Sequence, residues 1–135
     1  MSNISGKGNM QERFEIHVHT GFSAAHFLEG YPGNCANIHG HNWAVDVYVT
    51  CGQLNEIGIG IDFRDVKQAI NDIVKDFDHR YLNELDVFAN INPTSENIAK
   101  HFYQKLSNRL NSDIVKVSKV KISESPKAGV FYWEE

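Results

Sequence analysis

The stretch 35–41 contains three residues whose types and spacing could do chemistry together. Cys35 is followed by His39 and His41, and Gly40 separates the two histidines. On an extended backbone, side chains two positions apart project from the same face, so both imidazoles can reach one ion. Zinc in a catalytic site usually takes three protein ligands and keeps a fourth position open. The pair therefore predicts a metal site if a third donor lies nearby. On spacing alone, two ordinary turn histidines remain the alternative.

Candidates for the third donor lie in the preceding segment. His26 follows the small residues Ser23–Ala25, which leave room for a bound group. His17 and His19 form a rival pair with the same spacing as the first. Alternation along their strand places this pair on the face opposite the apolar residues Phe14, Ile16 and Val18. A polar outer face is the simpler interpretation of His17 and His19.

Other polar residues fall at the ends of predicted elements, where they have both a chemical and a structural interpretation. The thiol of Cys35, with an ordinary pKa of about 8.5, would be mostly protonated at neutral pH and would need a base or a cation to transfer protons. Asp78 and His79 come where a helix is expected to end, and there they could simply satisfy carbonyls and the helix dipole. Glu124 ends a predicted strand, where a solvated carboxylate is the alternative to a binding role. Two further hydroxyl residues can cap a helix, Thr94 and Ser95.

Periodicity predicts the elements that must position these residues. Apolar alternation favours strands over 14–19 and 43–50, and later over 115–124 and 130–133. Helical spacing of apolar residues predicts one helix over Phe63–Phe77 after an Asp62 cap, and a second from Thr94 or Ser95 to Leu110. We expect bulges at Gly21 and near Ser118, where the apolar parity shifts. The element order is thus strand, strand, helix, helix, strand, strand.

The length and composition of the chain limit its class. A chain of 135 residues suits a single domain, which we place at 12–135 after a loose polar tail at 1–11. Thirteen Lys and Arg against seventeen Asp and Glu give a net charge of −4, so no overall basic field favours nucleic acid. Neither a membrane span nor a signal peptide is apparent, and we expect a cytoplasmic protein with Cys35 and Cys51 reduced.

Five motifs in order resemble the 6-pyruvoyl-tetrahydropterin synthase family. They cover the chain from about Phe14 onward: Ser23-Ala24-Ala25-His26, Cys35-x3-His39-Gly40-His41, Asp78-His79-x2-Leu82-Asn83, Pro93-Thr94-Ser95-Glu96-Asn97 and Glu124. None of these motifs is specific by itself, but their combination is. The resemblance implies an α+β tunnelling fold, with a four-stranded antiparallel sheet and two helices on one face. Such sheets join edge to edge into a barrel, which implies a homo-oligomer, a trimer or a hexamer, with sites between subunits.

The resemblance also assigns roles to the candidate residues. It implies that His26, His39 and His41 bind zinc and that Cys35 accepts a proton. Asp78 and His79 resemble the relay that tunes this thiol, and Glu124 resembles the glutamate that holds the pterin ring and takes part in the relay. Two residues resemble the segment that lines the pterin pocket, Thr94 and Ser95. The implied substrate is a small pterin triphosphate, with no nucleic acid and no membrane as partner.

Within the family, the chain looks most like the 6-carboxytetrahydropterin synthases of queuosine biosynthesis. These are zinc-dependent lyases that convert 7,8-dihydroneopterin triphosphate to 6-carboxytetrahydropterin, acetaldehyde and triphosphate. The alternative within the family is 6-pyruvoyl-tetrahydropterin synthase, whose members typically have a longer gap between the cysteine and the His-Gly-His motif than the three residues found here. A different class, a non-catalytic zinc-stabilised module that binds pterins or purines, would need the histidines but not Cys35, Asp78 or His79.

Overall fold

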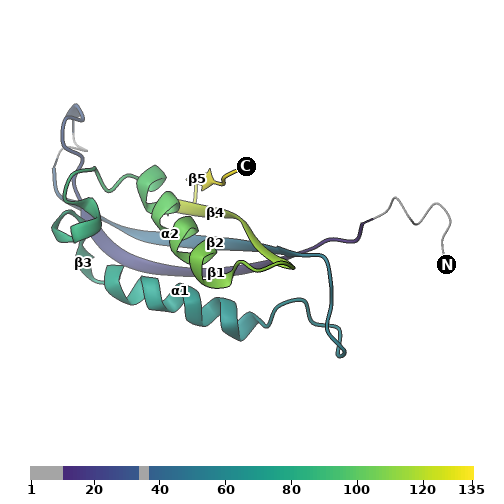
Figure 1. Cartoon of the computed structure of the whole chain (residues 1–135). Coiled ribbons are helices and arrows are strands. Elements are labelled where there is room, and N and C mark those ends of the chain that lie inside the picture. Colours follow the sequence, from purple (N-terminus) through teal and green to yellow (C-terminus); the bar gives the residue numbers. More distant parts are fainter. Residues whose placement is uncertain (1–10, 34–36) are drawn as a thin grey trace.

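The computed structural model describes residues 11–33 and 37–135, and Figure 1 shows its arrangement. Two helices pack against one five-stranded sheet, in which the strand order is β3-β1-β2-β4-β5. The elements in chain order are β1 (Phe14–His26), β2 (His39–Cys51), α1 (Phe63–Phe77), β3 (Arg80–Tyr81), two short 3₁₀ turns (Leu82–Glu84 and Asp86–Phe88), α2 (Ser95–Leu110), β4 (Val115–Ser125) and β5 (Ala128–Tyr132). The α+β class and the predicted helices are therefore confirmed. The tail predicted at 1–11 falls outside the described residues except for Gln11.

Strands β1 and β2 form the longest ladder of the sheet and curve together through the centre of the molecule (Figure 1). They pair antiparallel without interruption from Phe14 opposite Cys51 to His26 opposite His39. The predicted bulge at Gly21 is wrong, because Gly21 keeps its register opposite Ala44. The glycine is needed for close approach instead, since a Cβ there would lie 2.7 Å from the carbonyl oxygen of Trp43. As a result β1 runs beyond the expected end at His19 and reaches His26.

The bulge predicted near Ser118 is confirmed. Tyr48 pairs with Lys119 while its neighbour Val49 pairs with Val117, so Ser118 is the extra residue in β4. A single inserted residue reverses which side chains face the core. Before the bulge the odd-numbered residues of β4 are buried, and after it the even-numbered residues Val120 and Ile122 are buried. The parity after the bulge places Glu124 on the side of the sheet that carries the helices.

A fifth strand was not predicted and corrects the four-stranded antiparallel sheet. The two residues of β3, Arg80 and Tyr81, pair in parallel with Ala24 and Ala25 of β1. Two residues are too few to show an apolar alternation, so the sequence pattern could not reveal them. This pairing brings the end of α1 beside the last residues of β1, so Asp78 and His79 lie next to this strand.

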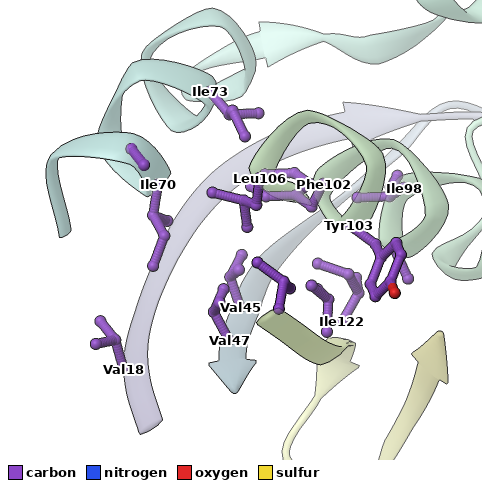
Figure 2. Close-up of a cluster of buried hydrophobic side chains, with 14 of the residues drawn as sticks. Val18, Val45, Val47, Ile70, Ile73, Ile98, Phe102, Tyr103, Leu106 and Ile122 are labelled. Atoms are coloured by element: carbon purple, nitrogen blue, oxygen red, sulfur yellow. The ribbon is translucent and has the colours of Figure 1, made fainter. Parts of the chain in front are cut away.

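The hydrophobic core lies between the helices and one face of the sheet. Figure 2 shows side chains of α1 and α2 pointing toward Val45, Val47 and Ile122 of the strands. All four apolar residues that predicted the first helix are buried, namely Val66, Ile70, Ile73 and Phe77. Each helix begins at its predicted cap: Asp62 accepts the backbone N–H of Arg64, and Thr94 accepts that of Asn97. None of the helices described is long and apolar enough to cross a membrane.

The opposite face of the sheet is polar, as predicted for His17 and His19. Both side chains are exposed, and both imidazoles hydrogen-bond the same carboxylate oxygen, Oδ1 of Asp46, at 2.7 and 2.8 Å. The ring of His17 also stacks on that of Tyr48, with 4.5 Å between the ring centroids. These contacts explain the two histidines without a bound ion.

The close approach at Gly21 gives a stability prediction. In Gly21→Ala the new methyl group must displace the Trp43 backbone, so the free energy of unfolding should fall by about 1–3 kcal/mol. Gly40→Ala is the matched control, because Gly40 also pairs with an alanine of the same ladder and its Cβ would meet its nearest atom at an ordinary 3.8 Å. Urea unfolding of both variants in the presence of a chelator measures the difference. Equal stabilities would show that the backbone adjusts without cost.

Candidate metal centre and its cavity

Three histidines converge where the β1–β2 ladder ends. The register places His26 directly opposite His39, and His41 lies two residues further along the same face of β2. One nitrogen from each of the three rings lies within 4.8 Å of the others, so the structure brings together the three predicted ligands. The His26 ring centroid is 4.5 Å from that of His39 and 5.3 Å from that of His41. The cluster is compact enough to hold one metal ion.

Backbone carbonyls determine the tautomers of two of these rings. Nδ1 of His26 lies 2.7 Å from the carbonyl oxygen of Pro93, and Nδ1 of His39 lies 2.7 Å from that of Asn37. A carbonyl can only accept a hydrogen bond, so each Nδ1 must carry the proton. The Nε2 lone pairs are then free for coordination. Among the described residues, Nε2 of His26 and Nε2 of His41 are buried and have no hydrogen-bond partner. His26 combines both features, a buried Nε2 without a partner and an Nδ1 held by a carbonyl, and this combination is typical of a metal-binding histidine.

Burial keeps two of the rings neutral. Loss of water lowers the pKa of His26, and the neighbouring imidazoles lower it further against the opposing effect of the Pro93 carbonyl. Burial likewise lowers the pKa of His41, although the Glu124 carboxylate acts in the opposite direction. Neutral imidazole is the form that binds metal ions. The site is therefore prepared for a cation at neutral pH without a competing proton.

Trp43 forms the floor of the cluster. The edges of the His26 and His41 rings pack against its indole, at centroid distances of 5.0 and 5.2 Å. Trp43 is buried, and its Nε1–H donates to the carbonyl oxygen of Ala24 at 3.2 Å. The indole thus fills the space below the histidines and restricts the directions that their rings can take.

Glu124 reaches the same place from the other side of β2. Its Oε2 lies 3.5 Å from Nε2 of His41, and the side chain remains partly exposed. The β4–β5 pairing is irregular here, because Ser123 pairs with Gly129 and Ser125 pairs with Ala128, which leaves Glu124 between them. Bulges are common beside active sites because they re-aim a side chain. Both irregularities of β4 therefore contribute to directing this carboxylate toward the histidines.

A cavity of about 460 Å³ joins these groups. Thr94 and Ser95 line it where α2 begins, and Thr94 also accepts the N–H of Asn97 at 3.1 Å, so it is both a helix cap and a wall residue. The cavity combines six of the predicted site residues with three that were not predicted: His26, His39, His41, Thr94, Ser95 and Glu124, with Leu28, Tyr31 and Glu96. Glu96 belongs to a motif noted in the sequence and could have been included. Leu28 and Tyr31 lie in a loop without a periodic pattern that could have revealed them.

The structure does not bring Asp78 and His79 into this cavity of the same chain. Oδ1 of Asp78 accepts the backbone N–H of Ser23 at 2.9 Å, which lowers the Asp78 pKa, and lies 3.1 Å from Nδ1 of His79. The backbone N–H of His79 in turn donates to the Ser23 carbonyl at 2.6 Å. His79 lines a second cavity of about 510 Å³, whose wall also includes His41 of the cluster. The remaining lining residues are Ser23, Ala24, Ala25, Gly40, Asn42, Arg80 and Tyr81. His79 therefore shares the wall residue His41 with the first cavity, but neither Asp78 nor His79 lines that first cavity.

The backbone of His79 has an unusual conformation. His79 has a φ of +59°, a left-handed conformation that costs energy in any residue with a side chain and is often found where function requires it.

Cys35 lies outside the described residues, so its predicted role remains a prediction. Cys51 is buried in the core and has no polar role in the cavity.

Comparisons with known proteins agree on one family. Residues 15–135 match the family model described as 6-pyruvoyl tetrahydropterin synthase. A relative from Synechocystis, 38% identical over 67% of this chain and 73% of its own, is named 6-carboxy-5,6,7,8-tetrahydropterin synthase. Another from Pyrococcus furiosus, 32% identical over 81% of this chain and 88% of its own, is named dihydroneopterin monophosphate aldolase. The solved structure of 6-pyruvoyl tetrahydropterin synthase from Caenorhabditis elegans has a TM-score of 0.81 and 27% identity, covering 93% of this chain and 98% of that one.

The geometry of the cluster predicts how metal binding responds to substitution. His39→Ala and His41→Ala each remove one of the three nitrogens, so after loading with zinc and desalting they should retain less than about one tenth of the metal that the parent retains. His17→Ala is the control, since it removes an exposed imidazole that hydrogen-bonds Asp46. Elemental analysis gives the metal content per chain. Full occupancy in the His39 and His41 variants would show that the metal binds elsewhere.

Proposed function

Because the chain belongs to the 6-pyruvoyl tetrahydropterin synthase family, we propose that it is a zinc-dependent carbon–carbon lyase acting on a pterin triphosphate. The proposed reaction converts 7,8-dihydroneopterin triphosphate to 6-carboxy-5,6,7,8-tetrahydropterin, acetaldehyde and triphosphate, as a step of queuosine biosynthesis. One observation supports it most: three histidines and a carboxylate face one cavity at the end of the β1–β2 ladder. The name of the Synechocystis relative supports the 6-carboxy product.

His26, His39 and His41 would hold the zinc ion, and the carbonyls of Pro93 and Asn37 leave Nε2 of His26 and of His39 unprotonated for this purpose. When bound, zinc would supply Lewis-acid chemistry, making a substrate hydroxyl more acidic and stabilising the negative charge that develops as a proton leaves. Three protein ligands leave a coordination position for the substrate. The buried indole of Trp43 packs against the His26 and His41 rings and occupies that side of the cluster. The substrate would therefore approach the metal from the cavity.

Glu124 would bind the pterin ring. A pterin presents an amino group and a ring N–H side by side, and the two oxygens of one carboxylate can accept both. The partial exposure of Glu124 leaves this carboxylate accessible, and its 3.5 Å distance from His41 would keep the ring next to the metal centre. Leu28 and Tyr31 offer apolar wall area for the ring, and Thr94 and Ser95 offer hydroxyl groups.

Cys35 would accept the proton that leaves the substrate. Only three residues separate it from His39, and four residue steps span at most about 14 Å of extended chain. This chain length allows the thiol to reach the cavity. A base is still needed to generate the thiolate at neutral pH, and we assign this task to the Asp78–His79 pair.

A neighbouring subunit would bring that pair to the thiol. Within one chain Asp78 and His79 do not line the cavity of the three histidines, whereas the family resemblance implies that they act in the same site. Among the described residues, β3 pairs with Ala24 and Ala25 only, so most of the outer edge of β1 is free to pair with another sheet. We therefore propose a homo-oligomer, a trimer or a hexamer, in which sheets join edge to edge and each site is shared between subunits.

Product identification tests the proposed reaction. The zinc-loaded protein is incubated in parallel with 7,8-dihydroneopterin triphosphate and with the monophosphate, and the products are identified by mass spectrometry. The proposal expects 6-carboxytetrahydropterin and acetaldehyde from the triphosphate. A 6-pyruvoyl product, turnover of the monophosphate alone, or no turnover with tight pterin binding would instead indicate a pyruvoyl synthase, an aldolase or a non-catalytic binding module.

Replacing the thiol should separate chemistry from metal binding. Cys35→Ala should keep its zinc and still bind pterin, while turnover falls about 100-fold or more, as expected for a lost general base. Cys51→Ala is the matched control: it removes a buried core thiol and should keep its turnover well below the unfolding temperature. Loss of zinc from Cys35→Ala would identify the thiol as a ligand and contradict the assignment.

The role of Glu124 predicts a selective loss of pterin affinity. Glu124→Gln keeps the shape but replaces one acceptor oxygen by a donor, which would face a ring N–H. A charge-assisted hydrogen bond contributes about 1.5–3 kcal/mol, so the affinity should fall by roughly ten- to a hundred-fold. Calorimetric titration with a non-reactive pterin measures it, with zinc content checked as unchanged. An unaltered affinity would remove Glu124 from ring recognition.

A further inference from the structure

Two asparagine side chains take over the pairing of β1 immediately after His26. Asn83 accepts the backbone N–H of Phe27 at 2.9 Å and donates to the Phe27 carbonyl at 3.1 Å. Asn92 likewise accepts the backbone N–H of Glu29 and donates to the Glu29 carbonyl, with both hydrogen bonds at 2.9 Å. Each amide thus satisfies the donor and the acceptor of one residue, as a neighbouring strand would. The chain leaving the metal ligand is therefore held at two points, two residues apart.

A third asparagine fixes the peptide that contacts His26. The backbone carbonyl of Asn92 accepts two hydrogen bonds, one from Nδ2 of Asn97 and one from the N–H of Thr94, both at 2.9 Å. The next carbonyl along the chain is that of Pro93, which accepts the Nδ1–H of His26 at 2.7 Å. Pro93 has a fixed φ and is buried, so these contacts leave its carbonyl little freedom to turn.

The orientation of this carbonyl decides whether His26 can bind a metal. A neutral imidazole carries its proton on one of two nitrogens, and the protonated nitrogen cannot coordinate. The Pro93 carbonyl keeps the proton on Nδ1 and leaves the Nε2 lone pair toward the other histidines. If the carbonyl turned away, the ring would be free to rotate and to change its tautomer.

We propose that Asn92 and Asn97 are positioning residues of the metal centre, which act through the Pro93 carbonyl to fix the tautomer and direction of His26, while Asn83 holds the backbone of Phe27 next to this ligand. The proposal rests on the zinc site of the proposed function. It concerns metal affinity and geometry, so it can be tested without turnover.

Asn97→Asp is the most informative substitution. It keeps the shape of the side chain but removes the N–H that holds the Asn92 carbonyl. The helix should survive, because an acidic residue in the first turn interacts favourably with the helix dipole. An added negative charge would by itself attract a cation, so weaker metal binding could not result from the charge.

Asn92→Asp is the second variant, and it removes the N–H donated to the Glu29 carbonyl. Asn108→Asp, exposed in the same helix, is the control with the same change of charge.

Zinc affinity is measured by competition with a chromophoric chelator, and site geometry by the visible absorption of the cobalt-substituted protein. We expect Asn97→Asp and Asn92→Asp to bind zinc about 10- to 100-fold more weakly than the parent and to show an altered cobalt spectrum. Asn108→Asp should match the parent in both measurements. Thermal unfolding of the metal-free proteins reports any loss of the fold separately.

Zinc affinities within about twofold of the parent, with an unchanged cobalt spectrum, would overturn the proposal. A lower unfolding temperature without a change in affinity would also overturn it, because the asparagines would then serve the fold alone. If the parent itself bound no zinc, the metal centre would fail together with this inference. If the parent bound zinc but did not turn over the pterin, only the proposed reaction would fail.

Discussion

The register of the β1–β2 ladder is the constraint on which the rest of the site depends. Because side chains alternate across a strand, a slip of one residue would move His39 and His41 to the polar face and separate them from His26. Register is held by the buried side chains along both strands and by the close contact at Gly21, where only a glycine fits against Trp43. The alternation of side chains that buries the core therefore also aligns the three imidazoles at the end of the β1–β2 ladder.

The cavity is completed by irregularities in β4 and by the start of α2. The extra residue at Ser118 changes the parity of β4, so that Glu124 follows Val120 and Ile122 on the helix-covered side. The cap of α2 brings Thr94 and the Pro93 carbonyl to the same place. Burial then lowers the pKa of His26 and of His41, which favours the neutral form of these two rings. The bulges of β4 and the N-terminal cap of α2, rather than the regular ladder, bring Glu124 and Thr94 to the cavity.

The two faces of the sheet have different tasks. The helix-covered face holds the core and the histidine cluster, whereas Asp78 and His79 are tied to the Ser23 backbone near the opposite face. The left-handed backbone of His79 holds that residue in an unfavourable conformation between α1 and β3. Asp78 and His79 do not line the cavity of the histidine cluster in a single chain, which is consistent with a site assembled from more than one subunit.

The sequence by itself determined the α+β class, both helices with their caps, the Ser118 bulge and the His39–His41 pair, whereas the choice of His26 as the third ligand came from the family resemblance. Those features depend on local periodicity, cap chemistry and the spacing of donors, all of which are written within a few residues of each other. Only the tertiary structure decided that β1 continues through Gly21 to His26, that Arg80 and Tyr81 form a fifth strand, and that Leu28 and Tyr31 line the cavity. It also decided that Asp78 and His79 do not line the cavity formed by the three histidines and Glu124. These outcomes depend on contacts between residues distant in the chain, where a single carbonyl or a two-residue pairing changes the result without leaving a periodic signal.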